Sequence, residues 1–162
     1  MNSRLFFFTS IIMIVISSVL AAHSYYNHTQ NQPFTCRIST EQQNNSAILK
    51  LSILFMFKRN YGIATINGQS SDSEGHNLKI RRDIYFNFKK DGDFYPLTSR
   101  KIINFPDDNV SNLWIGKYLP SFYVEKDQDL YFIIDKQKNG NYIFIMNSIP
   151  LFICKSISDN DK

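Results

Sequence analysis

The feature that most constrains the fold of this 162-residue chain is a strict alternation of side chains over residues 78–88. Leucine, isoleucine and phenylalanine take one face of this segment, while polar residues and a tyrosine take the other. A period of two residues predicts a β-strand with one buried face. Arg82 interrupts the apolar face. It is either a strand-end arginine that extends its charge into solvent or a buried charge that binds an acid or a ligand carboxylate.

Other strand-like segments follow one another along the chain, separated by polar turns. We predict them at residues 34–38, 47–58, 61–70, 94–105, 130–135, 142–146 and 151–156. Asn139-Gly140 is a strong hairpin signal, and Pro150 is expected to break the chain before the last strand. Strands do not alternate with helices, so we expect a mainly β domain with an antiparallel sheet, as a sandwich or a partly open barrel.

One short helix is predicted inside this domain, after the proline at position 106. Asp107 or Asp108 can cap its start, apolar residues recur at helical spacing, and Pro120 limits its end to about Tyr118. Trp114 lies within this helix. It is either an exposed anchor for a partner or a plug that packs the helix onto the sheet.

An uncharged apolar run, Leu5 to Ala22, precedes the β domain. A helix of about 20 apolar residues satisfies its own backbone in lipid, so we predict one transmembrane helix. Its expected lipid-facing residues are Leu5, Phe8, Ile12, Ile16 and Leu20. A cleaved secretory signal remains the alternative, with Val19 and Ala21 as small residues at the cleavage site.

The expected organisation follows from this anchor and from Arg4 on its amino-terminal side. Residues 1–4 form a cytoplasmic start, 5–22 a signal anchor, 23–33 a tether, 34–156 a periplasmic β domain and 157–162 a flexible tail. In either interpretation of the apolar run, the β domain is exported.

The two cysteines, Cys36 and Cys154, lie at the two ends of the β domain. Export places them in an oxidising compartment, so we expect a structural disulfide. A redox pair usually has Cys-x-x-Cys spacing, which is absent here. Two sulfurs and three scattered histidines give no zinc-ligand spacing, and no metal or other cofactor is expected.

Composition and motifs argue against two broad classes of function. The net charge is +4, and basic residues are interspersed with acidic ones, which differs from a nucleic-acid-binding surface. His76 lies beside serines and acids in the segment 70–77. Catalytic groups are assembled from separate elements rather than from one loop, so we expect a solvated loop and no enzyme.

Several short segments, in this order, resemble the FidL-like membrane proteins of enteric bacteria. They are Phe34-Thr35-Cys36, Tyr61-Gly62-Ile63 with Gly68, Lys79-Ile80-Arg81-Arg82, Phe94-Tyr95-Pro96-Leu97, Leu119-Pro120-Ser121-Phe122, Asn141-Tyr142-Ile143-Phe144 and Ile149-Pro150-Leu151-Phe152-Ile153-Cys154. The resemblance implies a single-pass inner-membrane protein of uncharacterised function. Some members look like companions of membrane-spanning winged-helix regulators of the ToxR-like kind. The resemblance implies no catalytic residues.

Two functions follow as hypotheses. The first is an anchored periplasmic interaction module, an accessory partner of a membrane-bound regulator or another envelope protein, with Arg82 and Trp114 as candidate contacts. Anchoring raises the effective concentration of two membrane proteins for each other, and a small antiparallel sheet offers its edges for strand addition. The alternative is a periplasmic sensor of an apolar ligand, based on 14 phenylalanines and 9 tyrosines.

Overall fold

The structure is a computed structural model that describes residues 3–30, 32–44, 47–72 and 77–157. Contacts divide the chain into two units, residues 1–32 and residues 33–162. The first unit contains one helix, α1 (Ser3–Gln30), which includes the apolar run and continues into the segment expected to be a tether. In the part of the chain that the structure describes, no helix combines the length and the hydropathy required to cross a membrane.

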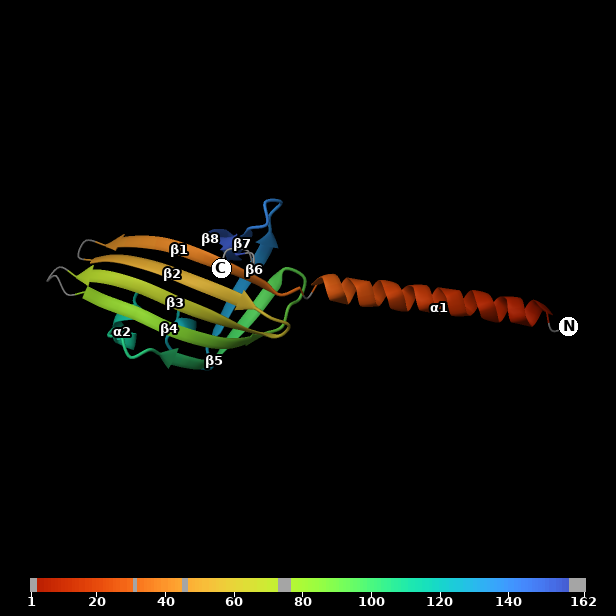
Figure 1. Ribbon diagram of the computed structural model, residues 1–162, viewed down its shortest axis with the longest axis horizontal. Helices are drawn as coiled ribbons and strands as arrows, with labels where there is room; N and C mark the ends of the chain where they lie inside the picture. The colour runs from red at the N-terminus through yellow and green to blue at the C-terminus, as the bar shows by residue number, and fades with distance from the viewer. Residues whose placement is uncertain (1–2, 31, 45–46, 73–76, 158–162) are drawn as a thin grey trace. The chain divides into compact units, whose positions relative to one another are not determined.

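The second unit is a closed barrel of eight antiparallel strands, drawn in Figure 1. The strands are β1 (Phe34–Asn44), β2 (Ala47–Phe57), β3 (Tyr61–Asp72), β4 (Asn77–Phe88), β5 (Phe94–Asn104), β6 (Asp129–Lys136), β7 (Tyr142–Met146) and β8 (Ile149–Ser156). Each strand pairs with the next one along the chain, and β8 pairs back with β1. The mainly β, antiparallel expectation is confirmed. The sheet closes into a barrel, which replaces both the sandwich and the partly open barrel.

The barrel closes around a core of aromatic and aliphatic side chains that point inward from alternate strand positions. In β4 the residues from Ile80 to Phe88 alternate between buried and more exposed side chains, as the sequence pattern predicts. Phe55, Phe57 and Phe86 are almost fully buried, with ring centroids 5.4–6.4 Å apart. Gly62 makes room for this cluster, because a Cβ atom there would overlap the Phe86 ring.

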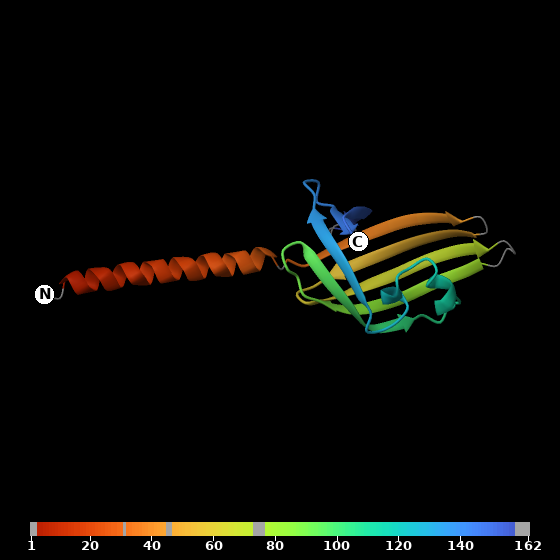
Figure 2. The same cartoon turned by 180° about the vertical axis from the view of Figure 1, so that it is seen from behind.

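The segment between β5 and β6 carries two short helical turns, α2 (Asn112–Ile115) and η1 (Ser121–Tyr123), and α2 lies beside β4 in both views (Figures 1 and 2). The predicted helix is therefore much shorter than expected. Its N-cap is Ser111, whose Oγ accepts a hydrogen bond from the Trp114 backbone N–H. Asp108 does not cap α2, because its carboxylate binds Arg82.

Two strand boundaries differ from the sequence-based prediction. β1 continues six residues beyond its expected end, to Asn44, along β2. β8 begins at Ile149, so Pro150 lies inside the strand instead of breaking the chain before it. Asn147 and Ser148 make the preceding turn with positive φ angles. Pro150 pairs with Ile145 beside a register shift, where a residue without an N–H is tolerated.

Candidate interaction surface

The outward side of β5–β8 is apolar, although it faces away from the core. Phe94, Ile133 and Ile145 are joined by pairing across three strands, and Ile143 pairs with Ile153 across the next interface. The Phe94 and Tyr131 rings stack at 6.0 Å between centroids. We call these six residues the apolar face: Phe94, Tyr131, Ile133, Ile143, Ile145 and Ile153.

The apolar face is accessible over much of its area. The exposed fractions are 50% for Tyr131, 42% for Ile133 and 64% for Ile153, while Ile143 and Ile145 are half-buried. The other side of β6 already supplies the core with Leu130 and Phe132. Contiguous apolar surface is uncommon on monomeric soluble proteins and marks interaction sites. The barrel does not need these outward side chains for its own core.

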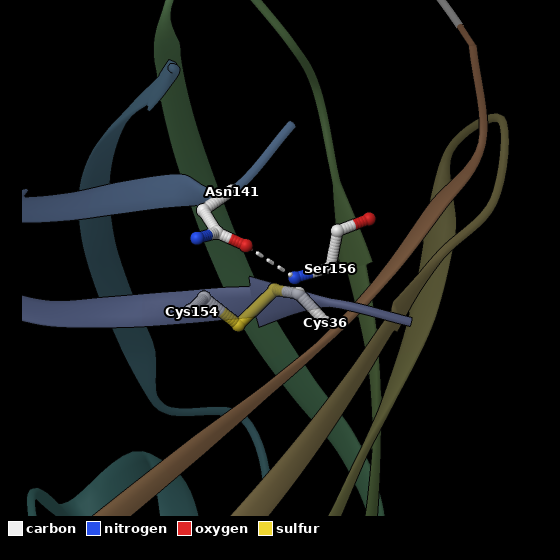
Figure 3. Close-up of a disulfide and its surroundings, with 4 residues drawn as sticks. All are labelled: Cys36, Asn141, Cys154 and Ser156. Atoms are coloured by element: carbon white, nitrogen blue, oxygen red, sulfur yellow. Dashed lines mark hydrogen bonds between the residues drawn. A yellow bond between two sulfur atoms is a disulfide. The ribbon is translucent and has the colours of Figure 1, made fainter. Parts of the chain in front are cut away.

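The apolar face ends at the line where the barrel closes, which we call the seam. Among the described residues, two pairs join β1 to β8 here, Cys36 with Ser156 and Arg37 with Lys155. The expected disulfide between Cys36 and Cys154 is present at this point (Figure 3). Two hydrogen bonds hold the end of β8, one to the residue before β7 and one to β1. The Ser156 N–H donates to Asn141 Oδ1 at 3.1 Å, and the Ile157 N–H donates to the carbonyl of residue 35 at 3.0 Å.

Beyond this closure the two strands no longer pair with each other. Within the described residues, β1 from Ile38 to Asn44 pairs with β2 alone, and β8 from Ile149 to Cys154 pairs with β7 alone. Each strand therefore leaves one edge unpaired along the seam. A hollow of about 270 Å³ lies beside it, lined by Arg37, Ser39, Ile153, Lys155 and Ile157. Ile153 belongs to both the hollow and the apolar face.

Arg82, a predicted contact residue, is fully buried, so the strand-end interpretation is wrong. The alternative of a buried charge that binds an acid describes it better, and the acid is Asp108 of the same chain. Arg82 Nε and Nη2 donate to the two Asp108 carboxylate oxygens at 2.9 and 3.0 Å, and Nη1 donates to Asn112 Oδ1 at 3.1 Å. These bonds hold the segment before α2 against β4 and keep the guanidinium from the surface.

Trp114, the other predicted contact residue, is half-buried against the core. Its ring lies 4.7 Å from that of Tyr118, which fits the packing role better than an isolated exposed anchor. The neighbouring Leu113 is instead 86% exposed. Arg82 lies in β4 and Trp114 in α2, and neither belongs to the apolar face.

The expected anchor residues lie in α1, in the other unit. Phe8, Ile12, Ile16 and Leu20 have exposed side chains, and the side chain of Leu5 lies outside the described residues. His76 also lies outside the described residues, so the loop expected around it is not described. The segment expected to be a tail begins at Ile157, which is hydrogen-bonded to β1. Residues 158–162 lie outside the described residues.

Among the described residues, no group of three or more histidine, cysteine, aspartate or glutamate side chains could hold a metal ion. A larger hollow of about 680 Å³ crosses β1–β4. Its lining combines polar residues such as Glu41, Lys50 and Asn67 with the apolar Leu51 and Ile80.

Burial and nearby charge change the pKa values of several side chains of the barrel. Burial, helped by the nearby charges of Asp93 and Tyr142, raises the pKa of Tyr95 to about 12. Burial also raises the pKa of Tyr142, and it lowers the pKa of Lys90 against the opposing effect of Asp93. These directions follow from the cost of placing a charge away from water.

The apolar face and the seam were not among the residues predicted to bind a partner, although the sequence carries a signal for the former. Residues 142–146 and 149–153 are almost unbroken apolar runs, without the alternation expected for a strand that has one wet face. The seam has no comparable signal, because pairing between the first and last strands depends on how the barrel closes.

Comparison with known proteins places this chain in a family. The model of the YqeJ C-terminal domain matches residues 33–154, which include almost the whole barrel. The chain is also 27% identical over 146 residues to the uncharacterized protein YqeJ of Escherichia coli (strain K12), covering 88% of this chain and 86% of that protein. No solved structure matches. The family name differs from the FidL-like one expected, but an uncharacterised family with an enterobacterial member agrees with that expectation. The chain belongs to the YqeJ C-terminal domain family.

Proposed function

We propose that this protein is a membrane-anchored interaction module whose exported barrel binds and stabilises another envelope protein. The observation that carries the proposal is the apolar face, which pairs side chains across four strands on the outside of a domain that already has a core. Covering such a surface removes apolar area from water and stabilises a complex by about 25 cal/mol per Å² before the costs of association.

Anchoring and export are supported by the first unit and by the disulfide. Leu5 to Ala22 contains no charged side chain, and consecutive residues from Ile11 to Ile16 are all exposed on α1. A helix that is apolar on every side is typical of one covered by protein or lipid. The Cys36–Cys154 disulfide fits an oxidising compartment. We place the barrel in the bacterial periplasm, at the inner membrane.

The resemblance to the FidL-like family suggests the type of partner. Some members of that family look like companions of membrane-spanning transcriptional regulators. Two proteins anchored in one membrane meet at a high effective concentration, so a modest contact area is enough for association. The proposed role is binding. It requires no catalytic residue and no cofactor.

The test uses the full-length protein in its native host, crosslinked and extracted in detergent, with a membrane regulator encoded beside it as the candidate partner. We expect the two to co-purify, and we expect Ile133→Lys and Ile153→Lys to reduce recovery strongly. Leu113→Lys is the matched control, because Leu113 is more exposed than either isoleucine and lies away from the apolar face. Recovery of the unsubstituted protein alone after crosslinking would count against the proposal.

Anchoring needs a separate measurement. Alkaline carbonate extraction of membranes should leave the full chain in the pellet, because an inserted helix is held by its apolar surface rather than by charge. Release of the uncut chain into the supernatant would contradict the anchor. A shortened mature chain would instead support the cleaved secretory signal.

The alternative, a sensor of an apolar ligand, has less support from the barrel. Its interior is occupied by packed rings, including Phe55, Phe132 and Phe144, whose centroids lie 5.1–6.4 Å apart. Ligand-binding barrels hold their ligand in an interior cavity. Native mass spectrometry of the purified protein that showed a retained apolar molecule would favour the sensor.

A further inference from the structure

We propose that the seam binds an extended segment of a partner protein, with apolar side chains facing inward and an acidic side chain facing outward, by strand addition to β1. This inference rests on the proposed interaction role, and it names the chemistry of the segment that would be recognised. Three features of the seam carry it: an unpaired backbone edge, two adjacent cations and a hollow with apolar walls.

The backbone edge is the first feature. After Arg37, the side of β1 that faces β8 has no strand partner among the described residues, although β1 is fully paired with β2 on its other side. Unpaired N–H and C=O groups along a sheet edge are a template for another extended chain. Proteins that recognise peptides by strand addition use such an edge for affinity and the neighbouring side-chain positions for specificity.

The second feature is the pair of cations where β1 and β8 separate. Arg37 and Lys155 are directly opposite each other in the register, and both are exposed. Like charges in that position destabilise a sheet. Neither cation has an acidic partner among the described residues, whereas Lys50 pairs with Glu41 and Arg100 with Asp127. A carboxylate from an added strand would therefore offset a repulsion that the barrel leaves in place.

The third feature is the hollow, which together with the inner side of the edge sets the pattern of side chains in an added strand. Side chains of a strand alternate between its two faces. On the inner side, an added residue would meet Ile38, which is buried, and the half-buried Phe152. On the outer side, the hollow of about 270 Å³ offers the cations together with Ile153 and Ile157. This arrangement favours apolar residues inward and an acidic residue outward near Arg37.

Glu41 sets a limit to this pattern. It lies on the same outward side as Arg37, further along β1, and forms an ion pair with Lys50 at 3.6 Å. An added strand with acidic residues at every outward position would bring one of them towards Glu41. The charge pattern of the edge thus fixes the register of the acidic residue at the end of β1 nearest the disulfide.

The test is a peptide-binding measurement on the full chain in detergent, by fluorescence anisotropy. The probe is a short synthetic peptide in which valine alternates with threonine and one central threonine is replaced by glutamate. The controls are the same peptide with lysine at that position and the same peptide with a central proline. We expect the acidic peptide to bind at least about tenfold more tightly than the lysine peptide, and the proline to abolish binding.

Variants of the seam test the role of the cations. Arg37→Glu with Lys155→Glu should reverse the preference in favour of the lysine peptide, and the milder Arg37→Gln with Lys155→Gln should remove it. The matched control is Lys101→Glu with Lys117→Glu, two exposed lysines outside the seam, and it should keep the preference for the acidic peptide. Unchanged preference in both seam variants would overturn the inference.

Hydrogen exchange separates strand addition from simple charge attraction. Bound acidic peptide should slow exchange of the β1 amides between Ile38 and Glu41 that face the seam, since those N–H groups would become donors to the peptide. Binding without added protection, or no binding by any peptide, contradicts strand addition. Loss of co-purification in Ile133→Lys, a residue of the apolar face outside the hollow, is a separate result, so a failure here and a failure of the proposed interaction role are distinguishable.

Discussion

Replacement of Asp108 by alanine should destabilise the barrel more than any nearby surface substitution. Arg82 is 0% exposed and the Asp108 side chain 1% exposed, and two hydrogen bonds join them. Removing the carboxylate leaves a buried guanidinium with only Asn112 and the Val110 carbonyl as acceptors. Breaking one partner of such a pair costs about 3–5 kcal/mol, because the remaining charge is uncompensated.

Arg82→Met should lower the free energy of unfolding by less than Asp108→Ala does. The Asp108 carboxylate also accepts hydrogen bonds from the backbone N–H groups of Arg81 at 3.0 Å and Val110 at 3.2 Å. It therefore keeps two donors when the guanidinium is lost. The double variant should cost less than the sum of the two single variants, because the second substitution removes the charge that the first had left unpaired.

The assay is urea unfolding of the oxidised protein followed by circular dichroism, with the thermal midpoint as a second readout. For a domain of this size, 3–5 kcal/mol corresponds to a fall in Tm of about 10 °C or more. The control is Asp107→Ala, whose carboxylate is 36% exposed and binds Lys79 at 2.7 Å. Equal losses for Asp107→Ala and Asp108→Ala, or additive losses in the double variant, would refute the argument from burial.

Three shorter predictions concern other parts of the barrel. Gly62→Ala should lower the free energy of unfolding measured in urea by about 1–3 kcal/mol, because the new Cβ would overlap the Phe86 ring. The raised pKa of Tyr95, about 12, means that its neutral phenol stabilises the fold below pH 10; this contribution is lost progressively as the pH rises from about 10 to 12, because the unfolded chain releases the proton first. Tyr95→Phe should reduce that loss in urea titrations across this range. Replacing Cys36 and Cys154 by serine should cost roughly 4–5 kcal/mol in the chain-entropy model, because the bridged residues are 118 positions apart, and a comparison of urea midpoints would measure it.

The strands could be predicted from the sequence because their signal is local. Residues 78–88 alternate strictly, and the structure buries the expected face of β4. The turn at Asn139-Gly140 was equally predictable, since Gly140 has the positive φ that such a turn requires. Local patterns do not determine how a sheet curves and closes, so the sandwich and the barrel could not be separated before the pairing of β1 with β8 was known.

The candidate contact residues were harder to predict, because their surroundings come from distant parts of the chain. In the sequence, Arg82 interrupts the alternating apolar positions of residues 78–88. This pattern shows that Arg82 is unusual, but it does not show which acid binds it. Asp108 was expected to cap a helix, a local role, whereas it forms a long-range pair with Arg82. That pair draws the segment before α2 along β4, which leaves Ser111 as the cap and shortens the helix.

The last two strands connect the sequence to the proposed interaction role. A strand with one wet face alternates, but residues 142–146 and 149–153 remain apolar at almost every position. Near-continuous apolar strands are typical of sheets covered on both faces. In the barrel only the inward side of these strands is covered, by packing that includes Phe144, while Ile153 is 64% exposed. Lysine at Ile153 should therefore leave the core intact and remove a contact outside it. We propose that a partner, bound where the apolar face meets the seam, covers the outer side of these strands.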